Sequence, residues 1–241
     1  VEALGPKVWR ADAALPPAEQ GVTILGTPLG HPDFVKAQLR ELLEEQGQLL
    51  ARIPDLQDIQ AAWLLLLYCA AARATYALRV VAPDLTEEYA QQHDVGLWTC
   101  LCRMLHVAPD AAEALGREAA QLPLHAGGLG LRCARRLRAA AHWASWADSL
   151  PMSHERRPDI AERLVADSDA AAAASDEATP VARAVAACVG SLDRARWVAP
   201  SWASLAAGAR PEAPPDEEAA DPGAWQHGWH FYAARALDLD C

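Results

Sequence analysis

The sequence predicts a mainly α-helical protein with a short β-strand or hairpin near its N-terminus. Within the 241 residues, only residues 21–30 combine β-forming side chains with closely spaced turn residues. Most of the remaining chain has apolar residues at helical spacing, and it is rich in alanine and leucine, which favour helices. A hydrophobic content of 52% is ample for one or two packed domains.

The β-forming stretch is Val22-Thr-Ile-Leu25, which predicts a short buried strand. The residues after it predict a tight turn at Gly26, Pro28 and Gly30. Pro32 suits the first turn of a helix, where its missing N–H costs nothing. We therefore expect the order strand, glycine turn, long helix. Val8-Trp9 could form a second strand that pairs with the first, although the loop between them is long for a hairpin.

The first long helix is predicted over residues 32–53. Apolar residues recur there at helical spacing, at Val35, Leu39, Leu42, Leu49 and Ile53. Gln46 interrupts this stripe. Pro54 ends the helix, and Asp55 is a natural N-cap for the next one.

The second helix, over residues 56–81, is the most apolar. Four consecutive leucines at residues 64–67 point in every direction around the axis, so we expect this helix to be buried on most faces. The apolar run is bounded by Gln60 and Arg73 and is shorter than the roughly 20 residues that span a bilayer. We therefore predict a core helix and no membrane segment.

Further helices are predicted downstream, with a glycine-rich loop between the fourth and fifth. Thr86 and the acidic residues after it predict the start of the third helix. The later helices are expected at residues 109–121, 131–150, 158–166, 181–192, 197–205 and 224–239. Pro151 is expected to end the fifth, and the acidic, proline-rich residues 211–222 read as a linker.

Charge and cysteine content limit the classes of function and of site that suit this chain. The formal net charge of −11 argues against a general nucleic-acid binder, but residues 126–158 carry six arginines against only Asp148 and Glu155. The six cysteines have neither zinc-site spacing nor the pattern of a disulfide scaffold, so buried free thiols are favoured. Because the chain begins with Val1, we expect it to be part of a longer protein.

Two motifs resemble reverse transcriptases of non-LTR (LINE-type) retrotransposons. Gly21-Val-Thr-Ile-Leu-Gly-Thr-Pro-Leu-Gly-His-Pro-Asp-Phe-Val35 is similar to the segment after the catalytic palm, where a Leu-Gly pair forms the primer grip. Leu122-Pro-Leu-His-Ala-Gly-Gly-Leu-Gly-Leu131 is similar to the element that follows the thumb helices. With the helices between them, the motifs cover roughly residues 7–150.

The resemblance implies a domain plan. Residues 1–31 would be the end of the palm with the primer-grip strand and turn, and residues 32–150 a helical, thumb-like bundle. Beyond them would come a helical extension, the acidic linker and the terminal helix, over residues 151–210, 211–222 and 223–241.

The same resemblance sets limits on the chemistry. Nucleotidyl transfer uses paired carboxylates that hold two divalent ions, and the family carries these in the palm, before the primer grip. This sequence contains no Asp-Asp pair, so the chain alone is not expected to be catalytic, and Mg²⁺ is expected only in the missing palm. The implied partners are an RNA/DNA template–primer duplex and the palm and fingers of the same polyprotein, and the implied location is nuclear.

The candidate binding residues fall in the two motifs. The resemblance points to Leu25, Gly26, Thr27 and Gly30 in the first. In the second, a glycine loop that opens a helix can present N–H groups to a phosphate, with arginines nearby. Its candidates are Gly127, Gly128, Gly130, Arg132, Arg135, Arg136 and Arg138. The structural alternative is an ordinary strand-to-helix turn in the first motif, and a glycine turn beside a solvated basic face in the second.

A second function class stays open, namely a helical scaffold or protein-interaction module that does not bind nucleic acid. It predicts stacked amphipathic helices with tryptophans at contact surfaces and no basic groove. No metal site is predicted, because the pair His227 and His230 has no carboxylate or thiol clearly poised beside it.

Overall fold

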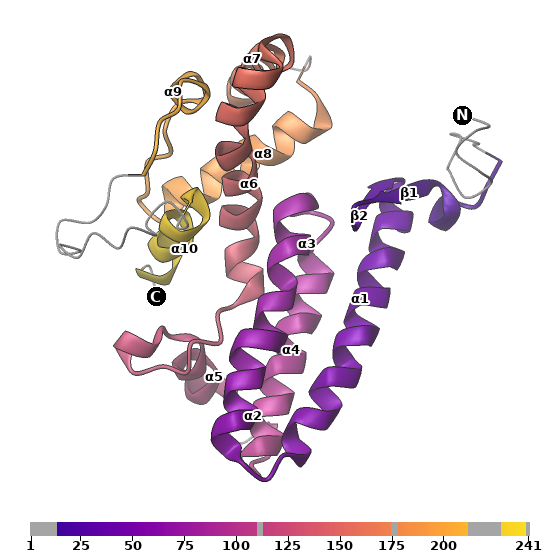
Figure 1. The fold of residues 1–241 in the computed structure, drawn as a ribbon, viewed down its shortest axis with the longest axis vertical. Helices are drawn as coiled ribbons and strands as arrows, with labels where there is room; N and C mark the ends of the chain where they lie inside the picture. Colours follow the sequence, from indigo (N-terminus) through magenta and orange to yellow (C-terminus); the bar gives the residue numbers. More distant parts are fainter. Residues whose placement is uncertain (1–13, 110–112, 175–177, 212–227, 240–241) are drawn as a thin grey trace. The chain divides into compact units, whose positions relative to one another are not determined.

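The structure is a computed structural model that describes residues 14–109, 113–174, 178–211 and 228–239 (Figure 1). These residues are mainly helical and contain one two-stranded antiparallel sheet, as the sequence predicts. The chain divides into two compact units, residues 1–135 and 136–241. The division falls near the start of a long helix, whereas the sequence suggested a boundary after residue 150. The predicted acidic linker lies almost wholly outside the described residues.

The sheet is a hairpin of β1 (Gly21–Ile24) and β2 (Thr27–Gly30). The prediction of a turn over residues 26–30 is therefore wrong, because the turn consists of Leu25 and Gly26 alone. Pro28 pairs with Thr23 in β2, which has a single neighbouring strand and so tolerates a residue without an N–H. Val8 and Trp9, the strand partner considered from the sequence, lie outside the described residues.

Three long helical segments form the bundle of the first unit (Figure 1). They are α1 (Pro32–Arg52), the segment Ile59–Val80, and α4 (Glu87–Met104). The middle segment consists of α2 (Ile59–Leu65), a π-helical turn (Leu66–Ala70), a 3-10 turn (Ala71–Arg73) and α3 (Ala74–Val80). The segment contacts both α1 and α4, which also pack against each other.

Gln46 belongs to the buried stripe of α1 rather than interrupting it. It is only 2% exposed, and its Oε1 lies 2.9 Å from Nδ1 of His93 on α4. Burial lowers the pKa of His93, while the Asp94 carboxylate and a backbone hydrogen bond with Ala71 act in the opposite direction. Ala71 lies in the irregular part of Ile59–Val80, so the polar pair joins α1 and α4 to that break in the helix.

The segment Ile59–Val80 is less buried than the sequence suggested. Its buried residues form one stripe of mostly small side chains, at Ala62, Leu66, Ala70, Ala74, Ala77 and Leu78. Leu64 and Leu65 are exposed, and Tyr68 is 66% exposed. Two neighbouring helices cover one face of this segment, and the apolar side chains on the other face remain in solvent. By length and composition alone the segment could cross a membrane, a test that core helices of soluble proteins also pass.

The second unit is built from helices around a tryptophan cluster. Most of α6 (Ala134–Arg156) belongs to it, with α7 (Pro158–Ala172), α8 (Pro180–Arg194), α9 (Trp202–Ala206) and α10 (Trp229–Leu239). Trp143 is fully buried, and its ring centroid lies 5.0 Å from that of Trp197 and 5.7 Å from that of Trp229. These tryptophans therefore pack in a core.

The fifth helix does not end at Pro151, as the sequence suggested, but continues through it to Arg156. A proline in a helix removes one backbone hydrogen bond. Beside it, the hydroxyls of Ser149 and Ser153 donate to the carbonyls of Trp146 and Ser149. The Asp148 carboxylate accepts a 2.8 Å hydrogen bond from the backbone N–H of Trp229 at the start of α10.

Candidate nucleic-acid interface

The hairpin tip, Leu25 and Gly26, has an unusual backbone. Leu25 has a φ of 50° and Gly26 a φ of 81°, so two consecutive residues are left-handed, as in a type I′ turn. Asn-Gly is the favoured pair for this turn, and a left-handed leucine costs about 1–2 kcal/mol. The Leu25 side chain nevertheless stands in solvent, with the residue 92% exposed. The tip therefore holds a strained, apolar residue away from the core.

Tyr76 of α3 holds this tip. Its hydroxyl donates a 2.6 Å hydrogen bond to the carbonyl of Leu25 and lies 2.9 Å from Oγ1 of Thr27. Because the single phenolic hydrogen goes to the carbonyl, the Thr27 hydroxyl is the donor in the second bond. The ring of Tyr76 lies under Gly26, where an added Cβ would be 3.5 Å from Cε1. Three of the predicted residues, Leu25, Gly26 and Thr27, therefore meet at one tyrosine.

The base of the hairpin packs closely against Phe34 and the Gln20 backbone. Gly21 and Gly30 form its last cross-strand pair. A Cβ on Gly21 would come within 2.1 Å of the Phe34 ring, and one on Gly30 within 2.3 Å of the Gln20 carbonyl oxygen. Gly30 is thus required by close backbone packing, at the opposite end of the hairpin from Leu25.

The glycine loop, residues 122–130, lies between α5 (Glu113–Gln121) and the start of α6. The N–H groups of its glycines bond to backbone carbonyls of the same loop: Gly127 to Leu124, Gly128 to Pro123 and Gly130 to Leu122. A Cβ on Gly128 would lie 2.0 Å from the Leu122 carbonyl oxygen. The expected cradle of N–H groups open to a phosphate is therefore wrong, because the loop uses these groups to close on itself.

The N-terminus of α6 is also occupied. The Asp94 carboxylate on α4 accepts hydrogen bonds from the N–H groups of Ala134, at 2.8 Å, and Arg135, at 3.2 Å. The Cys133 thiol donates to the same carboxylate. Asp94 is 5% exposed, so an internal anion already fills the place at which the sequence suggested a phosphate.

The arginines remain candidates through their side chains. Arg135 and Arg136 are exposed on the first turn of α6, whereas Arg132 and Arg138 are half-buried. Arg132 precedes the helix, whereas the sequence predicted a helix that begins at residue 131. The structure thus leaves one exposed pair, Arg135 and Arg136, at the start of this helix.

Both sequence motifs rest against the segment Ile59–Val80. The hairpin tip contacts Tyr76, while Leu129 accepts a 3.3 Å hydrogen bond from Nε1 of Trp63. Gly130 approaches the side chain of Leu67. Leu67 and Tyr76 are nine residues apart, which is about 13 Å along a helix. The motifs are therefore two contacts along one helical segment and do not merge into one loop cluster.

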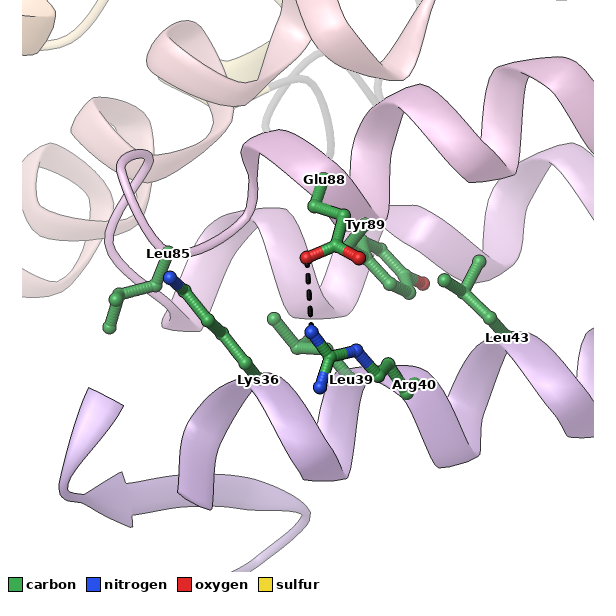
Figure 2. A pocket seen from close by; sticks show the side chains of 7 residues that line it. All are labelled: Lys36, Leu39, Arg40, Leu43, Leu85, Glu88 and Tyr89. Carbon is green, nitrogen blue, oxygen red and sulfur yellow. Dashed lines mark hydrogen bonds and ion pairs between the residues drawn. The ribbon is translucent and has the colours of Figure 1, made fainter. Parts of the chain in front are cut away.

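The hollows of the described residues are small. The one in Figure 2 lies between α1 and the start of α4, where Nη2 of Arg40 is 3.3 Å from Oε2 of Glu88. Its volume is about 10 Å³, which is room for one water molecule, and two others are equally small. Binding sites for small molecules are typically far larger than these three hollows.

The cysteines of the described residues include both buried and exposed thiols. Burial raises the pKa of the Cys100 thiol to about 11, with the Arg103 charge opposing it, and burial also raises that of Cys102. Cys69 is exposed, contrary to the expectation of buried thiols, and has no disulfide partner among the described residues. Within the same ranges, no three His, Cys, Asp or Glu side chains group as metal ligands.

Sequence reasoning missed Tyr76 and Asp94, the two side chains that hold these motifs in place. Tyr76 is an aromatic residue in a segment otherwise read as buried, and Asp94 is an acid in the middle of an apolar helix face. Each is a polar group in a stretch whose other residues are mostly apolar, and this mismatch is the sequence feature that could have identified them. Comparisons with protein-family models, with curated proteins and with solved structures find no match to this chain.

Proposed function

We propose that this chain is the primer-grip and thumb part of a LINE-type reverse transcriptase, and that it holds an RNA/DNA template–primer duplex. The observation that carries the proposal is the hairpin tip. The residues that match the Leu-Gly pair of the family, Leu25 and Gly26, are a strained turn that holds a leucine in solvent. Strained backbone that its surroundings keep in place is more common at ligand-binding positions than elsewhere.

The outer face of Ile59–Val80 supports the same role. The segment contains Arg73 and Arg79 and no acidic residue, although the whole chain has a net charge of −11. Its exposed positions include Tyr68 and small residues such as Ala72 and Thr75. Small side chains allow a nucleic-acid backbone to come close, and arginines neutralise its phosphates. This face is therefore a suitable surface for a duplex that also reaches the hairpin tip.

The exposed pair Arg135 and Arg136 supplies a second electrostatic contact. It follows the glycine loop, which lies against Trp63 and Leu67 of the same helical segment. In this proposal the loop only packs against the helical segment, and the phosphate contacts come from guanidinium groups. The chain supplies binding only, because the carboxylates that would hold catalytic Mg²⁺ are assigned to the palm.

The test is binding of an RNA/DNA primer–template duplex by the whole chain across a salt series. We expect the affinity to fall as salt rises, and Arg135→Ala/Arg136→Ala to weaken binding and reduce the salt slope by about 1–2. Arg163→Ala/Arg194→Ala is the matched control, since it removes two exposed arginines from α7 and α8. The control should leave binding near the wild-type value, apart from the small effect of net charge.

The alternative is a protein-interaction module, favoured by the exposed apolar residues Leu64, Leu65 and Tyr68. It predicts that the folded wild-type chain does not bind the duplex even at low salt. It also predicts that Leu64→Ser/Leu65→Ser reduces association with a protein partner or a second copy. Equal loss of duplex binding in the two double-arginine variants would likewise contradict the proposed duplex site, because it would show a net-charge effect.

A further inference from the structure

We propose that Tyr76 is a positioning residue, which fixes the hairpin tip so that the Leu25 side chain meets the nucleic acid. The inference rests on the proposed function and adds a residue that neither sequence motif contains. Tyr76 acts through Leu25, and its own contact with the ligand is not required.

The tip depends on the Tyr76 hydroxyl. The hydroxyl donates to the Leu25 carbonyl at 2.6 Å and accepts from Thr27 at 2.9 Å. It therefore spans the turn, with one bond to the residue before Gly26 and one to the residue after it. The Leu25 carbonyl accepts this bond while Leu25 is left-handed, with a φ of 50°, so the bond favours the strained conformation over the extended one.

The base of the hairpin does not need Tyr76. Its strands are tied to α1 and to the preceding turn: the Phe34 ring packs on Gly21, Thr23 Oγ1 donates to Gln38 Oε1 at 3.1 Å, and the N–H of His31 donates to Gln20 at 2.8 Å. Removing the Tyr76 hydroxyl should therefore release the tip while the strands stay anchored. This separation allows a local effect to be measured without unfolding the chain.

The direction of Tyr76 depends on the irregular part of its helix. A π turn has more residues per turn than an α-helix, and this changes the direction of the side chains that follow. The turn Leu66–Ala70 lies between Trp63, which donates to the glycine loop, and Tyr76. The backbone of Ala71, just after it, is hydrogen-bonded to buried His93 of α4. The bundle core thus fixes the irregular segment that aims Tyr76 at the hairpin.

The experiment compares Tyr76→Phe with Tyr68→Phe in the whole chain. Both variants remove one phenolic hydroxyl from an exposed position of Ile59–Val80, and Tyr68 makes no hydrogen bond with the described residues. Hydrogen exchange of the hairpin amides is measured without nucleic acid, and duplex affinity is measured separately. Loss of the two hydrogen bonds of the Tyr76 hydroxyl should speed exchange near the tip and weaken binding, each by about five-fold, in Tyr76→Phe only.

A double-mutant cycle with Leu25→Gly separates positioning from general stability. Glycine adopts a left-handed φ without strain and has no side chain to present. If Tyr76 acts by placing the Leu25 side chain, Tyr76→Phe should have no further effect on duplex affinity in the Leu25→Gly background. A purely structural role would reduce affinity equally in both backgrounds, and that result would overturn the proposal.

The two proposals can fail separately. Unchanged hairpin exchange in Tyr76→Phe would overturn the role of Tyr76, whatever the affinity for the duplex. Failure of the folded wild-type chain to bind the duplex would contradict the proposed function, and the exchange data would still decide whether Tyr76 fixes the tip.

Discussion

The hairpin tip and the glycine loop are two turns that the sequence marks in the same way, and they differ in what they present to solvent. Both contain glycines with positive φ, at Gly26 in the first and at Gly127 and Gly130 in the second. Both rest against the segment Ile59–Val80. The tip turns a leucine outward, whereas the loop turns its N–H groups inward and bonds them to its own carbonyls.

This difference shows that glycine spacing alone does not distinguish a ligand cradle from a packing turn. The deciding quantity is where the backbone hydrogen bonds go. In the loop, the glycine N–H groups have partners within the loop, and the Asp94 carboxylate bonds the N–H groups at the start of α6. At the tip, the external partner is the Tyr76 hydroxyl, and the side chain beside it is exposed. Each of the following predictions tests one part of this contrast.

The largest effect is expected from Gly128→Ala. The new Cβ would lie 2.0 Å from the Leu122 carbonyl oxygen, a backbone atom that accepts from Gly130, so the loop must open. We expect a loss of about 3 kcal/mol or more in the free energy of unfolding, measured by urea denaturation. Gly127→Ala is the control, since it meets no atom within 4 Å and carries only the strain of φ 82°, about 1–2 kcal/mol. Equal losses in the two variants would contradict the inward packing of the loop.

A slightly smaller effect is expected from Asp94→Ala. The change leaves two backbone N–H groups at the start of α6 without their acceptor in a buried place, at a cost of about 2–3 kcal/mol. Asp58→Ala removes the exposed N-cap of α2, which bonds the N–H groups of Gln60 and Ala61, and should cost only about 1 kcal/mol. If the two variants lose equal stability in urea unfolding, Asp94 is an ordinary surface cap.

The sequence was informative where local chemistry determines structure. Helical periodicity predicted α1, α4, α7 and α8, and the β-formers at Val22 and Ile24 predicted a strand. It was misleading where the residue types are unusual for the element: the second strand was hidden because Thr27–Gly30 contains a proline and a glycine, although it pairs with the first strand through a two-residue turn. The candidate residues were named from motifs, but the hydrogen-bond partners that decide their roles lie about 50 residues away for Leu25 and about 40 for Arg135.

Acidic pH should lower the free energy of unfolding through His93, which is buried on α4. Burial lowers the pKa of His93 below its ordinary value of 6.5, despite the nearby Asp94 carboxylate and the backbone of Ala71, so the unfolded chain takes up the proton more readily. The free energy of unfolding should therefore be full above the unfolded pKa of 6.5 and fall as the pH drops below it towards the folded pKa. His93→Gln should show a flatter dependence over the same range. An identical slope in wild type and variant would exclude His93 as the titrating group.

The smallest effect on stability, and the sharpest test of the contrast, is expected from Leu25→Asn. Asparagine favours the left-handed conformation of a type I′ turn, so the variant should gain about 0.5–1 kcal/mol in hairpin stability, read from hydrogen exchange. It should also lose duplex affinity by about ten-fold, because an apolar contact is removed. Leu29→Asn changes another exposed leucine of the hairpin, outside the turn, and should do neither. A stabilised hairpin with unchanged duplex affinity would mean that the tip, like the glycine loop, serves packing geometry alone, because a leucine kept in a strained position without a ligand contact has no functional reason to be there.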